Sequence, residues 1–235
     1  MFLPSTAGEE RWDQHFRNEI TFVPLRRFFL FNDHRFRDFN LLFAAANSKV
    51  RSHPMTKVEQ RQEIRRRLAS FNATDRQAAS QIIARQILAL PAFHAAKVVA
   101  LYTHLPSEPE TLPLFQAATR LVVFPRTDAA TKRIDFYRVR AWSELIPGSF
   151  GVREPDPERC SLVPMSAIEF LLVPGMAFDR HGWRLGRGGG FYDRLLEQLP
   201  KSVPRVGAFF ACQELPQVAQ EAHDQPLDVV VTEVS

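Results

Sequence analysis

The chain has 235 residues, of which 45% are hydrophobic and 24% charged, and its net charge is +4. This composition is that of a globular protein with a sizeable core, and it excludes fibrous and wholly disordered chains. The apolar runs fall far short of the roughly 20 residues that cross a bilayer, so we expect no membrane partner. The modest positive charge is compatible with binding of anionic small molecules and with weak binding of nucleic acid, and it does not distinguish between the two.

The two cysteines, Cys160 and Cys212, are too few for a disulfide scaffold and do not have the spacing of metal ligands. We therefore expect both to be packing residues. The same cysteine usage predicts a reducing compartment, and we expect the protein to be cytoplasmic.

The first 54 residues differ from the rest of the chain. They hold nine of the 20 phenylalanines, many beside arginine, and show no sustained helical or alternating period. They fit neither a secretory signal nor a transit peptide. We predict a poorly ordered N-terminal extension over 1–54, followed by one domain over 55–235 that begins at Met55. The alternative is an aromatic and basic arm that stacks on RNA.

Two helices open the predicted domain. Thr56 and Glu59 form a capping box at the start of the first, and its apolar residues recur on one side at Val58, Ile64 and Leu68. The stretch "NATDRQAASQIIARQILAL" predicts the second helix, with Thr74 as its cap and Pro91 as its stop.

Short apolar runs typical of buried strands then alternate with helices. The strand runs are 97–102, 121–125, 168–174, 205–210 and 227–233, and the helices are 112–120 and 192–199. The run 134–139 alternates and predicts an edge or hairpin strand, whereas 147–157, rich in Pro and Gly, predicts a loop. This order predicts an α/β fold of three αβα layers, Rossmann-like, with a mainly parallel sheet.

The stretch "GWRLGRGGGFYDRLL", residues 182–196, holds five of the chain's ten glycines. It follows the strongest predicted strand, at whose carboxyl end ligands gather in such folds. Glycines let successive backbone N–H groups reach an anion, the next helix adds partial positive charge, and Arg184 and Arg187 add full charges. Asp193 at the helix start could hold a phosphate-bound Mg²⁺. The stretch predicts a phosphate cradle, although it is not a Walker A loop; the simpler alternative is a tight turn with close packing.

The longer stretch "VPGMAFDRHGWRLGRGGGFYDRLL" resembles the signature of the 5-formyltetrahydrofolate cyclo-ligase (5,10-methenyltetrahydrofolate synthetase) family. Further landmarks follow in the family's order: Lys57 with Arg61, the segment "LYTHLPSEPET", Pro125 with Arg126, Gly151 with Glu154 and Pro155, and Asp224 with Asp228. The resemblance runs from about Met55 to the end of the chain. Residues 1–54 have no counterpart in it.

The resemblance implies a ligase that forms a C–N bond. It cyclises 5-formyltetrahydrofolate to 5,10-methenyltetrahydrofolate and releases ADP and phosphate, with ATP as co-substrate and Mg²⁺ as metal. The formyl oxygen is phosphorylated, a neighbouring nitrogen closes the ring, and phosphate leaves. We expect a monomer that needs no nucleic acid.

The resemblance also implies the site residues. ATP is bound by Lys57, Arg61, Arg184, Leu185, Gly186, Arg187, Gly188, Gly189, Gly190, Phe191 and Tyr192. The folate is bound by Thr103, Glu108 and the run from Arg187 to Phe191, with Glu108 at the pterin end. Asp193 and Asp224 hold Mg²⁺, and Arg187 and Asp193 are the catalytic residues. Some family members have lysine where this chain has Gly189, so one cation near the phosphates is missing here.

Each of these residues also has a plainer interpretation. Lys57 and Arg61 would otherwise form a solvated basic face. Asp193 would stabilise its helix by a favourable interaction with the helix dipole. Asp224 would be a turn residue, and Glu108 would be an exposed loop acid. Phe178 and Trp183 could line the pocket or pack in the core. Two other functions remain open: an RNA-binding protein on the same fold, and a kinase-like enzyme for a different formylated or carboxylated substrate.

Overall fold

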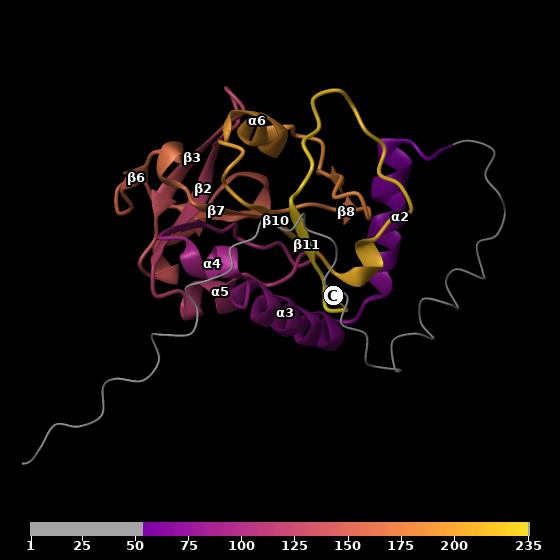
Figure 1. Cartoon of the computed structure of the whole chain (residues 1–235), viewed down its shortest axis with the longest axis horizontal. Helices are drawn as coiled ribbons and strands as arrows, with labels where there is room; N and C mark the ends of the chain where they lie inside the picture. Colours follow the sequence, from indigo (N-terminus) through magenta and orange to yellow (C-terminus); the bar gives the residue numbers. More distant parts are fainter. Residues whose placement is uncertain (1–53, 235) are drawn as a thin grey trace, which may run out of the picture.

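The computed structural model describes residues 54–234, and the predicted N-terminal extension up to residue 53 lies outside the described residues. A seven-stranded sheet with the order β11-β10-β7-β1-β2-β3-β6 forms the centre of the protein (Figure 1). The strands are β1 (Val98–Ala100), β2 (Leu121–Asp128), β3 (Arg133–Arg138), β6 (Leu162–Val163), β7 (Phe170–Val173), β10 (Arg205–Ala208) and β11 (Val229–Val231). Strands β11, β10, β7, β1 and β2 are parallel, and β3 and β6 are antiparallel additions at one edge. The predicted mainly parallel sheet is confirmed.

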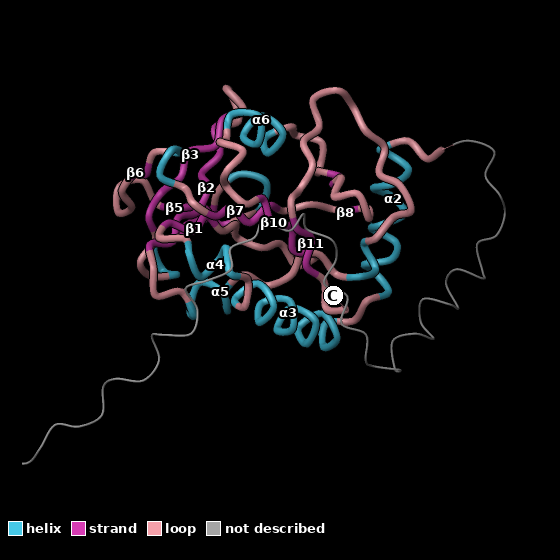
Figure 2. Tube along the Cα trace, viewed as in Figure 1, coloured by secondary structure: helices cyan, strands magenta, loops and turns pink. Residues whose placement is uncertain are grey.

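Helices cover both faces of this sheet. Figures 1 and 2 show α3 (Ala73–Leu88), α4 (Pro91–Ala95) and α5 (Leu112–Ala117) below it and α6 (Phe191–Gln198) above it. The core is divided accordingly: Ile83 and Phe93 of the lower helices pack with Phe170, whereas Leu196 of α6 packs with Leu171. Neighbouring residues of β7 thus face opposite layers, as the pleat of a strand requires. The predicted three-layer αβα architecture is confirmed.

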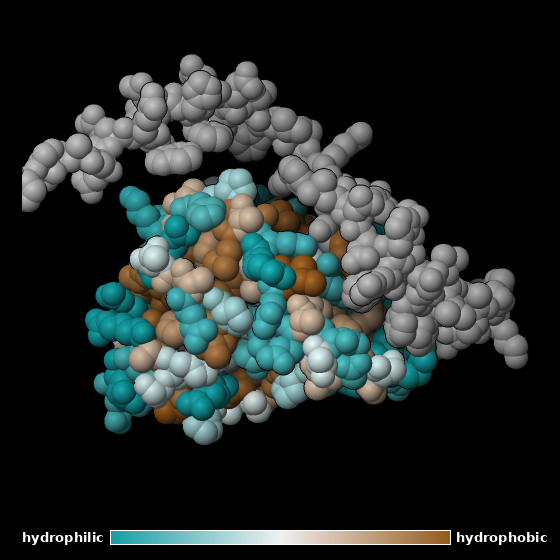
Figure 3. Space-filling model, turned by 90° about the horizontal axis from the view of Figure 1, so that it is seen from below, coloured by the Kyte–Doolittle hydropathy of each residue, from teal (hydrophilic) through white to brown (hydrophobic). Residues whose placement is uncertain are grey.

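Hydrophilic and hydrophobic residues are intermixed on the face seen from below (Figure 3). Among the described residues, no helix has the length and apolar character needed to cross a membrane.

Helix α2 (Lys57–Ser70) stands at the end of the sheet, beside β8 (Figure 1). The predicted capping box of Thr56 and Glu59 is present. Ile64 and Leu68 are buried as predicted, but Val58 is 60% exposed, so its assignment to the packed face was wrong. Val58 lies in the first turn, where the helix does not pack against the core.

Gln60 takes the buried position near the start of α2 instead. Its amide nitrogen donates to the carbonyl oxygen of Gln217 at 2.8 Å, and its amide oxygen accepts from the backbone N–H of Ala219 at 3.0 Å. A buried amide is tolerated because both ends are hydrogen-bonded. The side chain therefore attaches α2 to the C-terminal segment of the chain.

Helix α3 begins earlier than predicted. Asn72, not Thr74, is its cap: the backbone of Asn72 is extended, and its side-chain oxygen accepts from the N–H of Asp75 at 2.9 Å. Thr74 already lies in the first helical turn. Pro91 does not end α3, which stops at Leu88, but begins α4, where its missing N–H costs nothing.

The predicted loop 147–157 contains a short strand. Strand β4 (Leu145–Pro147) pairs antiparallel with β5 (Arg153–Pro155), and the turn is closed by the N–H of Gly148 donating to Val152. The Pro and Gly content of residues 147–157 is typical of a loop, so the sequence did not predict this hairpin. A second pair, β8 (Ala177–Phe178) and β9 (Arg184–Leu185), precedes the glycine-rich loop. Four 3₁₀ turns complete the described fold: η1 (Trp142–Glu144), η2 (Ser149–Gly151), η3 (Met165–Ala167) and η4 (Ala211–Gln213).

Candidate functional site

Part of the predicted site lies at the carboxyl ends of two neighbouring central strands, β1 and β7. The chain continues from β1 to β2 on one side and from the neighbouring β7 to β10 on the other, and such a switch point between two strands is where open α/β sheets bind ligands. Thr103 follows β1, and Gly175 follows β7. The β8–β9 hairpin then leads into the glycine-rich loop.

Two glycines of the loop have a left-handed backbone, Gly188 with φ +103° and Gly190 with φ +70°. Gly190 is the N-cap of α6 and, having no side chain, provides no capping hydrogen bond. The first N–H groups of α6 are therefore left for an anion, which the helix dipole also favours. This backbone geometry is compatible with the predicted phosphate cradle, which stays a prediction.

Arg184 and Asp193 form an ion pair beneath this loop. The guanidinium of Arg184, which is 5% exposed, donates to Asp193 Oδ1 at 2.7 Å and lies 5.9 Å from the centre of the Tyr192 ring. Burial lowers the pKa of Arg184, and the charges of Asp193, Tyr192 and Asp224 oppose that shift. Both carboxylates predicted to hold Mg²⁺ thus act on one buried guanidinium. Its Nε atom has no hydrogen-bond partner among the described residues.

Lys57 and Asp224 form a second pair, although 167 positions separate them in the sequence. The ammonium of Lys57 lies 3.0 Å from Oδ1 and 2.7 Å from Oδ2 of Asp224, and 3.2 Å from Oε2 of Glu221. Burial raises the pKa of Asp224, but hydrogen bonds from Lys57 and from the N–H of Glu221 outweigh it, so the pKa is lowered. The carboxylate is held charged beside the lysine.

The sequence did not indicate Glu221 or His223 as site residues. With Asp224 they form a group whose possible ligand atoms all lie within 4.8 Å of one another. Glu221 and His223 are exposed. A run of acidic and histidine residues before the predicted Asp224 was the signal available in the sequence.

Arg61 lies against the glycine-rich loop. Its Nε donates to the carbonyl oxygen of Gly186 at 2.9 Å, and its guanidinium would be 3.6 Å from a Cβ atom on Gly188. Lys57 and Arg61, one helical turn apart on α2, therefore both face the site as the resemblance implied.

Glu108 and Arg187 form the third pair. Glu108 Oε1 accepts from Nε of Arg187 at 3.1 Å and from its terminal nitrogen at 2.7 Å, while Oε2 accepts from the N–H of Leu105 at 2.9 Å. Glu108 is 5% exposed, so the plainer interpretation of an exposed loop acid was wrong. The nearby Thr103 donates its hydroxyl hydrogen to the carbonyl of Arg153 at 2.6 Å, which leaves the oxygen as an acceptor.

The glycine-rich loop ends at the predicted site residue Phe191, which pairs with Phe150, a residue that the sequence did not indicate. The rings of Phe150 and Phe191 meet edge to face at 5.4 Å; Phe150 is 66% exposed and has a left-handed backbone, with φ +58°. A Cβ atom on Gly189 would lie 2.7 Å from the Phe191 ring. A lysine at that position would require Phe191 to move.

The remaining candidates pack in the core. Phe178 is 6% exposed and lies 5.0 Å from the ring of Phe209, and Trp183 packs against the hydrophobic cluster below the sheet. Cys160 is buried and Cys212 is partly buried, and both are free thiols. The packing interpretation of these residues is confirmed.

The fold and the site together define an α/β protein with a glycine-rich loop that begins a helix and three ion pairs between predicted site residues. The model of the 5-formyltetrahydrofolate cyclo-ligase family matches residues 54–233. The chain belongs to that family.

Curated relatives support the assignment. The chain is 33% identical to a 5-formyltetrahydrofolate cyclo-ligase of Haemophilus influenzae over 177 residues, which cover 73% of this chain and 95% of that protein. It is 31% identical to that of Escherichia coli over 175 residues, covering 72% and 96% of the two chains.

Solved structures agree in fold. The NMR structure of a 5,10-methenyltetrahydrofolate synthetase from Aquifex aeolicus aligns with a TM-score of 0.68 and 32% identity, covering 77% of this chain and 91% of that one. The synthetase from Mycoplasma pneumoniae has a TM-score of 0.61 and 21% identity over 76% and 99% of the chains, and supports the fold alone.

Proposed function

We propose that this chain catalyses the reaction of its family, the ATP-dependent cyclisation of 5-formyltetrahydrofolate to 5,10-methenyltetrahydrofolate with release of ADP and phosphate. The observation that carries the proposal is the meeting of the glycine-rich loop with Arg61 and Glu108 at the switch point of the sheet. Lys57 lies one helical turn from Arg61 on the same helix. All of these groups come from one chain, so a monomer would suffice. The free cysteines are compatible with a cytoplasmic enzyme.

The loop and its cations would bind ATP. The N–H groups at the start of α6 would bind an anion, for which Arg61 beside the loop and Arg184 beside Asp193 would add positive charge. Lys57, one helical turn from Arg61, would add another. The remaining members of the predicted set, from Leu185 to Tyr192, provide the backbone around it. Phosphoryl transfer depends mainly on positioning and charge neutralisation, which this arrangement supplies without a protein nucleophile.

Glu108 would bind the pterin end of the folate. Its carboxylate is buried and already accepts two hydrogen bonds from one guanidinium, so it can accept from ring N–H and amino donors in the same direction. Arg187 would then be released from Glu108 and turn to the phosphoryl group. Thr103 would offer its free acceptor to the same substrate.

Asp193 and Asp224 fit the preference of Mg²⁺ for carboxylate oxygen. Asp193 Oδ1 is bound by Arg184, and both oxygens of Asp224 are bound by Lys57. These two cations are also assigned to ATP phosphates, so phosphate binding would release the carboxylates. Mg²⁺, when bound, would neutralise charge on the transferred phosphate.

The decisive experiment mixes the purified chain with 5-formyltetrahydrofolate, ATP and MgCl₂ and follows the ultraviolet absorbance of the methenyl product. We expect a signal that needs ATP and is abolished by EDTA. Glu108→Gln should raise the KM for the folate at least about tenfold, as the loss of a charged hydrogen bond does. Glu110→Gln, two residues away, is the matched control. An inactive wild-type chain that is folded would refute the proposal.

A further inference from the structure

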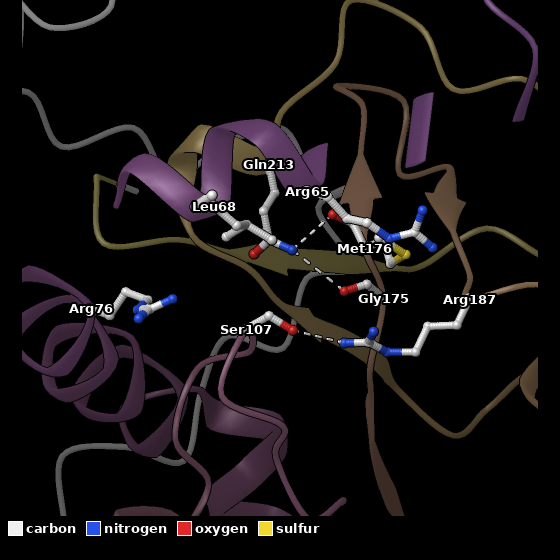
Figure 4. Close-up of a pocket in the computed structure, with 9 residues that line it drawn as sticks. Arg65, Leu68, Arg76, Ser107, Gly175, Met176, Arg187 and Gln213 are labelled. Carbon is white, nitrogen blue, oxygen red and sulfur yellow. Dashed lines mark hydrogen bonds between the residues drawn. The ribbon is translucent and has the colours of Figure 1, made fainter. Parts of the chain in front are cut away.

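The segment 102–111, between β1 and α5, carries two of the residues proposed to bind the folate, Thr103 and Glu108. This segment, the Glu108 loop, reaches the glycine-rich loop, because the hydroxyl oxygen of Ser107 accepts from Arg187 at 3.1 Å (Figure 4). Thr103 and Glu108 are both buried, so the loop holds their side chains against the protein. The position of the proposed folate ligands therefore depends on how this loop is closed.

Thr111 closes the loop from its far end. It is 1% exposed and is the N-cap of α5, but its side chain does not cap that helix; the hydroxyl donates instead to the carbonyl oxygen of Tyr102 at 2.7 Å. The backbone N–H of an N-cap residue has no acceptor within its own helix. The N–H of Thr111 donates to Nδ1 of His104 at 3.2 Å. Two hydrogen bonds of one threonine thus join the two ends of the loop.

The bond from Thr111 determines the state of the His104 ring. A backbone N–H can only donate, so Nδ1 is the unprotonated nitrogen and the proton of the neutral ring is on Nε2. Burial lowers the pKa of His104, and the nearby charges of Glu110 and Glu108 oppose that shift. The ring is therefore mainly neutral above about pH 7, and Nδ1 can accept the hydrogen bond.

Other contacts attach the loop to the protein without joining its ends. The hydroxyl of Thr103 donates to the carbonyl of Arg153 in β5 at 2.6 Å, and the N–H of Glu110 donates to the hydroxyl oxygen of Ser80 in α3 at 3.1 Å. Each of these bonds fixes one side of the loop on a different element. They leave the closure of the loop to Thr111 and its partners.

His104 offers Thr111 an acceptor that the rest of the described chain does not supply. No other acceptor among the described residues receives the N–H of Thr111. Because this N–H is buried, losing its partner would favour opening of the loop over the closed form. The ring of His104 also stacks on that of Trp142 in η1, with 6.4 Å between the ring centres. The ring and its Nδ1 atom therefore make separable contributions.

We propose that His104 is a positioning residue for the folate: its unprotonated Nδ1 joins the two ends of the Glu108 loop and so holds Thr103 and Glu108 in place for the substrate. An open loop would have to be ordered again when the folate binds, which weakens binding. The groups proposed for the ATP phosphates lie on α2 and the glycine-rich loop, so ATP binding should change little. The inference rests on the proposed function for its substrate.

Two substitutions separate the acceptor from the ring. His104→Phe keeps a ring beside Trp142 but has no acceptor, whereas His104→Asn loses the ring and places its amide oxygen near the position of Nδ1. We expect His104→Phe to raise the KM for 5-formyltetrahydrofolate about tenfold and to change the KM for ATP and kcat by no more than about twofold. His104→Asn should stay within about threefold of the wild type in all three constants. His94→Phe, at an exposed position of α4, is the matched control.

Hydrogen–deuterium exchange without any ligand, followed by mass spectrometry, measures the closure of the loop directly. Peptides that span residues 102–111 should exchange about tenfold faster in His104→Phe than in the wild type or in His104→Asn. Thermal unfolding shows that each variant is folded. Unchanged exchange of these peptides in His104→Phe would overturn the inference.

The kinetic outcomes are equally decisive. The inference is wrong if His104→Phe has the folate KM of the wild type, if His104→Asn is as impaired as His104→Phe, or if the KM for ATP rises as much as that for the folate. Calorimetric binding of 5-formyltetrahydrofolate without ATP separates the inference from the proposed function. If the wild type forms no product but binds this compound about tenfold more tightly than His104→Phe does, the proposed function fails and the positioning role of His104 stands.

Discussion

Changing Asp193 to asparagine should affect stability as well as catalysis. The substitution keeps the shape of the side chain but removes its charge, and the guanidinium of Arg184, with 2% of its side chain exposed, then loses its nearest counter-ion. Breaking a buried pair in this way costs about 3 to 5 kcal/mol. Asparagine can still accept one hydrogen bond and Asp193 is 17% exposed, so we expect a loss of about 2 to 3 kcal/mol.

This loss should appear as a fall of about 4 to 12 °C in the midpoint of thermal unfolding for a domain of this size. Urea titration of Asp193→Asn against the wild type measures the free energy of unfolding directly. The control is Asp135→Asn, whose partner Arg133 is exposed at 3.7 Å and whose loss should cost under about 1 kcal/mol.

A second substitution separates the two roles of Asp193. Combined with Arg184→Met, Asp193→Asn should unfold within about 1 kcal/mol of the wild type, because the unpaired buried charge is gone. Activity should stay absent, since the proposed metal ligand and the proposed ATP-binding Arg184 are both missing. The reasoning would be refuted if Asp193→Asn alone were as stable as the wild type, or if the double variant were no more stable than the single one.

Three further predictions concern other parts of the fold. The hydrogen bond from Arg66 outweighs burial and lowers the pKa of Glu63 from the ordinary 4.5 to about 2. Glu63→Gln should therefore lower the free energy of unfolding by about 1 kcal/mol above pH 4.5. Urea titrations should show that this difference shrinks as the pH falls toward 2. Gly190→Ala should cost about 1 kcal/mol because φ is +70°, and should raise the KM for ATP; a stable variant with an unchanged KM would contradict the loop geometry. Burial raises the pKa of Cys212 to about 12, so iodoacetamide at pH 8 should label it slowly in the native protein and rapidly in urea, as mass spectrometry can show.

Local signals predicted most of the fold. The capping box at Thr56 and the buried strands are encoded within a few neighbouring residues, so the sequence alone locates them. The errors arose where a distant contact decided the outcome. Val58 has the right spacing for the packed face of α2, but the core ends before it, and Gln60 is buried because the C-terminal segment provides partners for its amide.

The candidate site divides in the same way. Spacing within one stretch was enough to predict a phosphate cradle around Arg184 and Arg187, and the family resemblance added Lys57, Asp224 and Glu108. Only the tertiary structure showed that each predicted carboxylate is neutralised by a predicted cation, across 9, 79 and 167 positions of sequence. Such pairs depend on which strand ends and helix faces meet in space. The sequence determined which charged groups the protein has, and the folded sheet decided which of them oppose one another.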